Sequence, residues 1–168
     1  MKAEAINAAI TGLKEAGVNF VTSLPSKSIG DLIFAISKDS DFIHVPVANE
    51  NDAISICAGA WLGGKKSAFL GQNSGLVLAT YALMDSIHFF GGFPMLLLVD
   101  HRGDFGDAGG SWFYGYGLLL PKFLELMQIP YTIVRDPNKL TAELVRGGKT
   151  ADAYGKPAVI LLSGEEIW

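Results

Sequence analysis

Apolar residues recur along the chain in two patterns, one typical of helices and one typical of buried strands. Apolar positions spaced by three and four predict helices, the first of which ends at Gly17: residues 1–16, 26–37, 50–62, 75–88, 118–127 and 138–153. Short apolar runs predict six strands: residues 18–24, 42–48, 67–70, 94–99, 131–134 and 158–162. The alternation predicts one α/β domain over residues 1–168, in which a doubly wound, mostly parallel six-stranded sheet carries helices on both faces.

Two of these segments carry further information about their place in the fold. Pro46 has no N–H to donate to a neighbouring strand, so we expect the strand over residues 42–48 to lie at an edge of the sheet. The helix over residues 50–62 is apolar nearly all round and rich in Ala and Gly. Because such a helix packs closely on several sides, we expect it to be central and not on the surface.

The longest irregular stretch begins at residue 100 and extends to about residue 117. Long loops inside a compact domain usually have a function or are mobile. Open parallel sheets bind ligands at the carboxyl ends of their strands, which is where this loop starts. Its aromatic residues are expected to form either a lid over a site or an interface patch: Trp112, Phe113, Tyr114 and Tyr116.

Composition and charge argue against several classes of protein. Hydrophobic residues make up 49% of the chain and charged residues 18%, which leaves apolar surface that we expect to be buried against other subunits. A formal net charge of -4, without a basic run longer than Lys65-Lys66, argues against nucleic-acid binding. The single cysteine, Cys57, fits a reducing cytoplasm and, with no histidine cluster, predicts no metal site in this chain. No apolar segment approaches the roughly 20 residues of a membrane span.

Glu50 stands between a predicted strand and the first turn of an apolar helix. Acids are common at that position, because the helix dipole favours them, and Asn49 is a suitable cap. Position alone therefore favours a structural role. The surrounding order is more specific: a strand, a glutamate and then a helix of Ala and Gly. It resembles the pyrimidine-binding domain of thiamine-diphosphate-dependent 2-oxoacid decarboxylases.

The resemblance covers nearly the whole chain. Residues 17–25 are similar to the family's first strand and the proline-containing turn after it. Residues 71–75, Gly-Gln-Asn-Ser-Gly, are similar to the loop that opens the helix after the third strand. Residues 97–103 are similar to the substrate-side loop, and their sequence from residue 98 on is Leu-Val-Asp-His-Arg-Gly. Among these enzymes the chain looks most like the small alpha subunit of sulfopyruvate decarboxylase and the corresponding half of phosphonopyruvate decarboxylase.

The resemblance implies a set of site residues. Glu50 would hydrogen-bond the aminopyrimidine ring of thiamine diphosphate and activate it for attack on the keto carbon of the substrate. The other implied cofactor-binding residues are Pro25, Gln72, Asn73, Ser74 and Gly75. The implied substrate-binding residues are Ser26, Lys27, His101 and Arg102. For the polar residues at 72–74, turn and helix-cap chemistry is the alternative.

Two of these residues, Lys27 and Arg102, are cations that suit an anionic head group. The resemblance therefore implies the conversion of sulfopyruvate to sulfoacetaldehyde and CO₂, with phosphonopyruvate or another anionic 2-oxoacid as the alternative substrate. The structural alternatives are a solvated lysine at position 27 and an ion pair of Arg102 with Asp100 or Asp104.

One part of these enzymes has no match in the chain. The family binds the cofactor's diphosphate through Mg²⁺ on a second domain, marked by Gly-Asp-Gly and a downstream asparagine. Gly103-Asp104 is followed by Phe105, and Asn138 lies after a proline. We therefore expect a beta subunit that carries the diphosphate and Mg²⁺ site, in an assembly with at least two copies of each chain. A different class remains open here, a non-catalytic flavodoxin-like ligand-binding or regulatory domain in which Glu50 is merely a helix-start acid.

Overall fold

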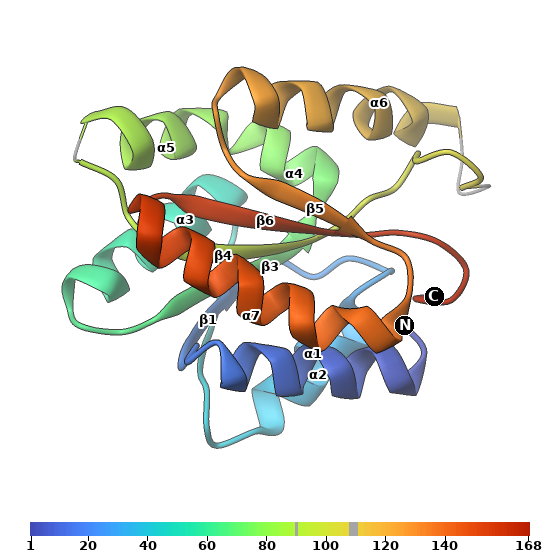
Figure 1. Cartoon of the computed structure of the whole chain (residues 1–168), viewed down its shortest axis with the longest axis horizontal. Coiled ribbons are helices and arrows are strands. Elements are labelled where there is room, and N and C mark those ends of the chain that lie inside the picture. Colours follow the sequence, from blue (N-terminus) through green and yellow to red (C-terminus); the bar gives the residue numbers. More distant parts are fainter. Residues whose placement is uncertain (90, 108–110) are drawn as a thin grey trace.

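The strands of the computed structural model, which describes residues 1–89, 91–107 and 111–168, form one parallel sheet (Figure 1). They are β1 (Phe20–Ser23), β2 (Ile43–Pro46), β3 (Ser67–Gln72), β4 (Met95–Asp100), β5 (Tyr131–Val134) and β6 (Pro157–Leu162). Their order across the sheet is β2-β1-β3-β4-β6-β5, and each neighbouring pair is parallel. The predicted six-stranded sheet is confirmed.

Helices cover both faces of this sheet, as a doubly wound fold requires (Figure 1). One layer consists of α1 (Ala3–Glu15), α2 (Gly30–Lys38) and α7 (Pro137–Tyr154). The other consists of α3 (Glu50–Leu62), α4 (Asn73–Leu78), α5 (Thr80–Met84), the π-helical turn η1 (Asp85–Phe89) and α6 (Ser111–Leu126). Across the described ranges, we find no helix with both the length and the apolar character needed to cross a membrane.

The central strands are apolar on both faces because helices lie on both sides of them. Every residue of β4 and of β6 is buried. Successive side chains of a strand point to opposite faces, so Leu96 and Leu98 enter the core beneath α1 and α7, whereas Leu97 and Val99 enter the core beneath α3 to α6. The sheet thus packs between two separate apolar clusters, and this packing fixes the position of its carboxyl edge.

The position of β2 confirms the expectation drawn from its proline. Among the described strands β2 pairs only with β1, and Pro46 lies opposite Ser23 at the end of that pairing. An edge position accommodates a residue that cannot donate to a ladder. The connection after β2 therefore starts at the margin of the sheet and leads directly to Glu50.

The loop predicted over residues 100–117 is shorter than expected. Helix α6 begins at Ser111, so Trp112, Tyr114 and Tyr116 are helical and the prediction of a loop there was wrong. Glycines weaken an isolated helix, but here they permit a close approach: a Cβ on Gly117 would lie 2.2 Å from the carbonyl oxygen of Gly103. Tertiary packing overrides propensity in this segment. Residues 108–110 of the predicted loop lie outside the described residues.

Two other predicted helices also differ from their expected form. The helix over residues 75–88 is divided into α4, α5 and η1. Hydroxyl groups bond to the backbone within it, from Thr80 to the Val77 carbonyl and from Ser86 to the Ala82 carbonyl, and such bonds bend helices. The helix predicted from residue 26 begins only at Gly30, after a turn.

Helix α3 is not enclosed on all sides in this chain. Its buried residues contact the sheet and α5, but Ser55, Ile56, Gly59 and Leu62 are exposed. The expectation of a central helix was therefore wrong for the single chain. The small, apolar composition that suggested burial describes a face that this chain leaves uncovered.

Candidate functional site

Four connections meet at the carboxyl edge of the sheet: those that follow β1, β2, β3 and β4. The carboxyl ends of β5 and β6 point to the right in Figure 1, toward the marked chain ends. Since all strands are parallel, residues that follow different strands come together at this one edge. All the site residues predicted from the sequence lie in or next to these connections.

Glu50 is the first residue of α3, directly after the cap. The side chain of Asn49 accepts a hydrogen bond of 3.0 Å from the Asp52 N–H, so the predicted cap is present. Glu50 itself takes no part in this capping. Its residue surface is only 7% exposed, which is unusual for a glutamate at the start of a helix.

The carboxyl group of Glu50 lies flat against Gly75, the third residue of α4. A Cβ built on Gly75 would be 1.9 Å from Oε1 of Glu50, so no residue other than glycine fits there without displacing the carboxyl group. Among the described residues no hydrogen-bond donor contacts the Glu50 carboxyl group. The residue is mostly buried, but its carboxyl oxygens keep contact with solvent, so they are available to a hydrogen-bond donor supplied from outside the chain.

Asn73 is fully buried and uses its side chain within the protein. Its Nδ2 donates to the Arg102 carbonyl at 2.6 Å, and its Oδ1 accepts from the Ser74 N–H at 2.9 Å. Gln72 is half-buried and makes no side-chain cap bond to α4. Only the bond from the Ser74 N–H is local turn chemistry, because Asn73 Nδ2 bonds to a different connection and Gln72 forms no cap bond. Cofactor binding by these side chains stays a prediction.

Asp100 is a buried member of the site that the sequence suggested only as an ion-pair partner. It is fully buried at the end of β4 and accepts hydrogen bonds from the Asn73 N–H, at 3.1 Å, and the Ser26 hydroxyl, at 3.2 Å. Burial raises the pKa of this carboxyl group, although hydrogen bonds from Ser28, Asn73 and Ser26 and the charge of Arg102 oppose the shift. An aspartate that ends an apolar strand, just before His101 and Arg102, was the available signal.

Arg102 pairs with an acid, but not with either of those considered from the sequence. Its Nε lies 3.0 Å from Oδ2 of Asp107, its Nη1 donates to Ser28 at 3.3 Å, and its guanidinium lies 5.2 Å from the ring centre of Phe113. The alternative expected from the sequence, an ion pair of Arg102 with Asp100 or Asp104, was therefore wrong, because the partner is Asp107. A loop of only four intervening residues brings Asp107 back to Arg102, a local reversal that the sequence pattern did not reveal.

Lys27 and Arg102 line the same open pocket, although they follow different strands. The pocket has a volume of about 310 Å³ and also includes Ser28 and Asp107. Lys27 is exposed, and Ser26, next to it, is half-buried. The two predicted cations therefore line one pocket, together with the Asp107 carboxylate that pairs with Arg102, and anion binding there stays a prediction.

His101 points elsewhere. It is buried, and its Nε2 lies 2.9 Å from the carbonyl oxygen of Gly117 in α6, so Nε2 is the nitrogen that donates. Its Nδ1 has no hydrogen bond and lies 3.9 Å from Oδ2 of Asp104. His101 therefore connects the end of β4 to Gly117 within α6, and a role in substrate binding stays a prediction.

Asp104 was missed as a structural anchor of the same loop. Its Oδ2 accepts hydrogen bonds from Ser163 and from Arg135. Burial raises the pKa of Asp104, but the hydrogen bonds from Ser163, from the Phe105 N–H and from Arg135 outweigh it and leave the pKa below its ordinary value. The carboxylate ties the loop after β4 to the segment after β6 and to the start of the connection after β5.

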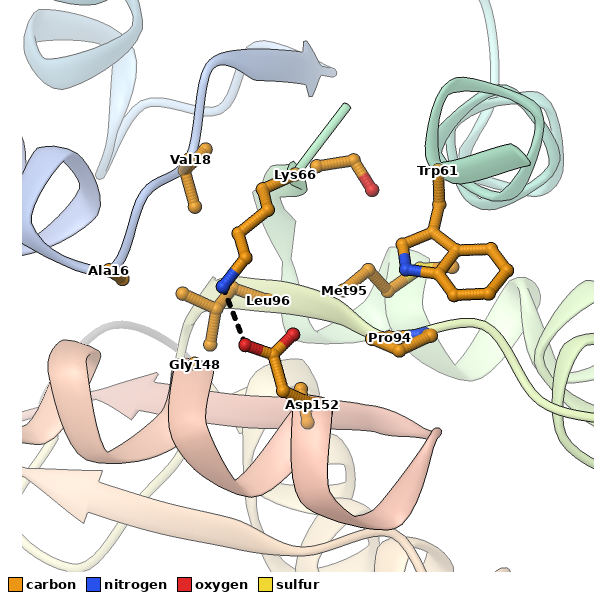
Figure 2. A pocket seen from close by; sticks show the side chains of 11 residues that line it. Ala16, Val18, Trp61, Lys66, Pro94, Met95, Leu96, Gly148 and Asp152 are labelled. Carbon is orange, nitrogen blue, oxygen red and sulfur yellow. Dashed lines mark hydrogen bonds and ion pairs between the residues drawn. The ribbon is translucent and has the colours of Figure 1, made fainter. Parts of the chain in front are cut away.

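A second hollow lies at the opposite, amino edge of the sheet (Figure 2). It has a volume of about 20 Å³, which is space for roughly one water molecule. Lys66 and Asp152 form an ion pair across it at 2.5 Å, and Trp61 lies to one side (Figure 2). Because its polar groups are paired and its volume is small, this hollow is not a candidate ligand site.

Exposed apolar side chains gather on one helical layer, the one that contains α3 to α6. They are Ile56, Trp61, Leu62, Leu78, Tyr81, Met84, Trp112, Tyr114, Tyr116, Leu118, Leu119 and Leu126. An open groove of about 660 Å³ between α3 and α5 belongs to this surface. No group of three or more metal-ligating side chains occurs within residues 1–89, 91–107 and 111–168.

Comparisons with known proteins find named relatives of this chain. No protein-family model matches the chain. The chain is 31% identical over 158 residues to the sulfopyruvate decarboxylase subunit alpha of Methanococcus maripaludis, and this match covers 94% of this chain and 93% of that subunit. It is 28% identical over 127 residues to the phosphonopyruvate decarboxylase of Streptomyces viridochromogenes, which covers 76% of this chain but only 32% of that enzyme.

A solved structure shares the fold. The 2-oxoglutarate:ferredoxin oxidoreductase from Magnetococcus marinus superimposes with a TM-score of 0.73 at 22% identity. The match covers 97% of this chain and 29% of that one. At this identity the likeness concerns the arrangement of strands and helices, and it extends over nearly all of them.

Proposed function

Since the chain belongs to the family of sulfopyruvate decarboxylase alpha subunits, we propose that it is the pyrimidine-binding subunit of a thiamine-diphosphate-dependent enzyme that converts sulfopyruvate to sulfoacetaldehyde and CO₂. The relatives are named as decarboxylases, so the chain is a subunit of a carboxy-lyase. The non-catalytic, flavodoxin-like alternative finds no support among them.

The observation that carries the proposal is Glu50, a mostly buried residue whose carboxyl group lies against Gly75 and accepts no hydrogen bond from the described residues. A flat heteroaromatic ring with a nitrogen at its edge fits this environment, because it offers the hydrogen bond that the carboxyl group lacks in this chain. Thiamine diphosphate supplies the electron sink that accepts the electron pair left by loss of CO₂. Glu50 holds the aminopyrimidine and exchanges a proton with its ring nitrogen.

The cationic pocket supports an anionic substrate. Sulfopyruvate carries a sulfonate in addition to its carboxylate, and Lys27 and Arg102 line one pocket. Asp107 and the ring of Phe113 hold the guanidinium of Arg102 in place, which lowers the entropy lost when it binds an oxyanion. Phosphonopyruvate has the same distribution of charge and stays the alternative substrate.

A partner subunit completes the enzyme in this proposal. The relatives of similar length are named alpha subunits, which implies a second chain. This chain spans about a third of the length of the phosphonopyruvate decarboxylase it matches. We propose that a beta subunit binds the diphosphate through Mg²⁺ and covers part of the apolar layer formed by α3 to α6. The free, buried Cys57 is compatible with the reducing cytoplasm in which we place the complex.

The test is reconstitution of the two subunits with thiamine diphosphate and Mg²⁺, followed by measurement of CO₂ release from sulfopyruvate, phosphonopyruvate and pyruvate. We expect the highest kcat/KM with sulfopyruvate, a lower value with phosphonopyruvate and little turnover of pyruvate. A preference for pyruvate would contradict the role of the cationic pocket. Full activity of the Glu50→Gln variant would contradict the assignment of Glu50.

A further inference from the structure

Asp100 lies at the centre of the carboxyl edge, between the residues assigned to the cofactor and those assigned to the substrate. It ends β4, the strand beside β3, and its partner in the β3–β4 register is Gln72. The residue is fully buried. A buried carboxyl group is costly unless its oxygens are hydrogen-bonded, so the donors that face Asp100 show what it holds.

The two oxygens of Asp100 bind two different connections. Oδ1 accepts from the backbone N–H of Asn73, the first residue of α4, at 3.1 Å. Oδ2 accepts from the hydroxyl of Ser26, in the connection after β1, at 3.2 Å, and Ser28 in the same connection also donates to this carboxyl group. Asn73 in turn donates through Nδ2 to the carbonyl of Arg102, in the connection after β4, at 2.6 Å. One carboxyl group and one amide thus tie three connections together.

Each connection held in this way leads directly to a proposed site residue. Asn73 stands two residues before Gly75, against which Glu50 packs. Ser26 immediately precedes Lys27 in the turn that lines the cationic pocket. A displacement of Asp100 would therefore alter the distance between the Glu50–Gly75 contact and the turn of Lys27.

We propose that Asp100 is a positioning residue, which acts through Ser26 and Asn73 to hold the cationic turn in register with the Glu50–Gly75 contact. This inference rests on the proposed function, because it concerns the simultaneous binding of an anionic substrate and a cofactor at the same edge. Asp100 itself touches neither ligand in this role. It sets the spacing of two groups that must contact different parts of the reacting complex, and small errors in such spacing lower reaction rates strongly.

The test compares four variants in the reconstituted complex of alpha and beta subunits: Asp100→Ala, Asp100→Asn, Ser26→Ala and the double variant Asp100→Ala/Ser26→Ala. Each is characterised by kcat and KM for sulfopyruvate, by the Kd of thiamine diphosphate in the presence of Mg²⁺, and by Tm. Val99→Ala is the matched control, because Val99 is equally buried on the same strand but packs into the apolar core. It is expected to lower Tm without changing KM or Kd.

We expect Asp100→Ala to raise KM about tenfold and to raise the Kd of the cofactor several-fold, since it removes hydrogen bonds to both connections. Asp100→Asn should restore most of the loss, because the amide oxygen can accept from the Asn73 N–H while the amide nitrogen donates to the Ser26 oxygen. Ser26→Ala should raise KM and leave the Kd of the cofactor within twofold of the wild type. Since both substitutions break the same bond, the double variant should match Asp100→Ala.

The inference is overturned if Asp100→Ala lowers Tm as Val99→Ala does while KM and Kd stay within twofold of the wild type. Additive effects of the two substitutions on KM would also overturn it. Should Asp100→Ala fail to yield a folded complex, Ser26→Ala and Asp100→Asn decide: unchanged KM in Ser26→Ala contradicts the coupling. Absence of turnover by the wild-type complex would instead contradict the proposed function, and the cofactor Kd would then still report on Asp100.

Discussion

The two edges of the sheet differ in how their polar side chains are satisfied. At the amino edge, Lys66 and Asp152 neutralise each other across a hollow that holds roughly one water molecule. At the carboxyl edge, Glu50 is mostly buried and accepts no hydrogen bond from the described residues, and Lys27 shares an open pocket with Arg102. Both edges consist of the same strands, so the fold alone does not make one of them a site. The difference lies in polar groups that are left for a ligand to complete.

The largest effect is expected from Glu50→Gln. The amide keeps the size of the side chain but cannot exchange the proton, so kcat should fall on the order of 10²- to 10⁴-fold. Because the carboxyl group has no donor in the free chain, Tm should stay the same or rise. Steady-state kinetics of the reconstituted complex measure kcat, and thermal unfolding of the free chain without cofactor measures Tm. A loss of Tm that accompanies the loss of activity would indicate a structural role instead.

Gly75→Ala should have the next largest effect. The new Cβ would meet Oε1 of Glu50 at 1.9 Å and displace the carboxyl group, which should lower kcat/KM on the order of 10²-fold. Gly30→Ala is the matched control, since a Cβ there meets nothing within 4 Å and the position lies at the start of α2, in the other helical layer. Equal activity of the two variants would show that the Glu50–Gly75 contact is not needed.

Arg102→Ala should change selectivity more than turnover. Loss of one charge-assisted hydrogen bond to the head group should raise KM for sulfopyruvate about tenfold, while the low activity with pyruvate should change little. Arg146→Ala, which removes an exposed arginine paired with Glu143 on α7, serves as the control and should behave as the wild type. If Arg102→Ala changed KM equally for sulfopyruvate and pyruvate, Arg102 would not recognise the head group.

The smallest effect is expected at the amino edge. Lys66→Ala breaks the ion pair with Asp152, but both side chains are nearly half exposed, so the loss should be roughly 0.2–1 kcal/mol of unfolding free energy. Decarboxylation should be unchanged. Denaturant unfolding and a single assay of the complex are sufficient. A strong loss of decarboxylation in Lys66→Ala would contradict the assignment of the site to the carboxyl edge alone.

Much of the fold followed from local pattern. The alternation of apolar runs with helical stripes predicted all six strands, and Pro46 predicted that β2 lies at an edge of the sheet. Glu50 could be singled out because strand, acid and small-residue helix are contiguous in the sequence. These features are local, and their outcome does not depend on distant parts of the chain.

The features that were missed depend on contacts between distant segments. The early start of α6 requires Gly117 to pack against the backbone of Gly103. The role of Asp100 requires Ser26, which lies 74 residues away in the sequence. The open face of α3 shows that an apolar composition indicates burial without indicating which chain supplies the cover.

The contact between Gly103 and Gly117 has a consequence for how such chains can diverge. A Cβ on Gly103 would lie 1.9 Å from the Phe113 carbonyl oxygen, and one on Gly117 would strike the backbone of Gly103. A second mutation can shorten a side chain but cannot remove backbone atoms. A substitution of Gly103 or Gly117 therefore has no simple compensating change. In a library selected for activity, or among descendants of this chain, we therefore expect the two glycines to be retained together.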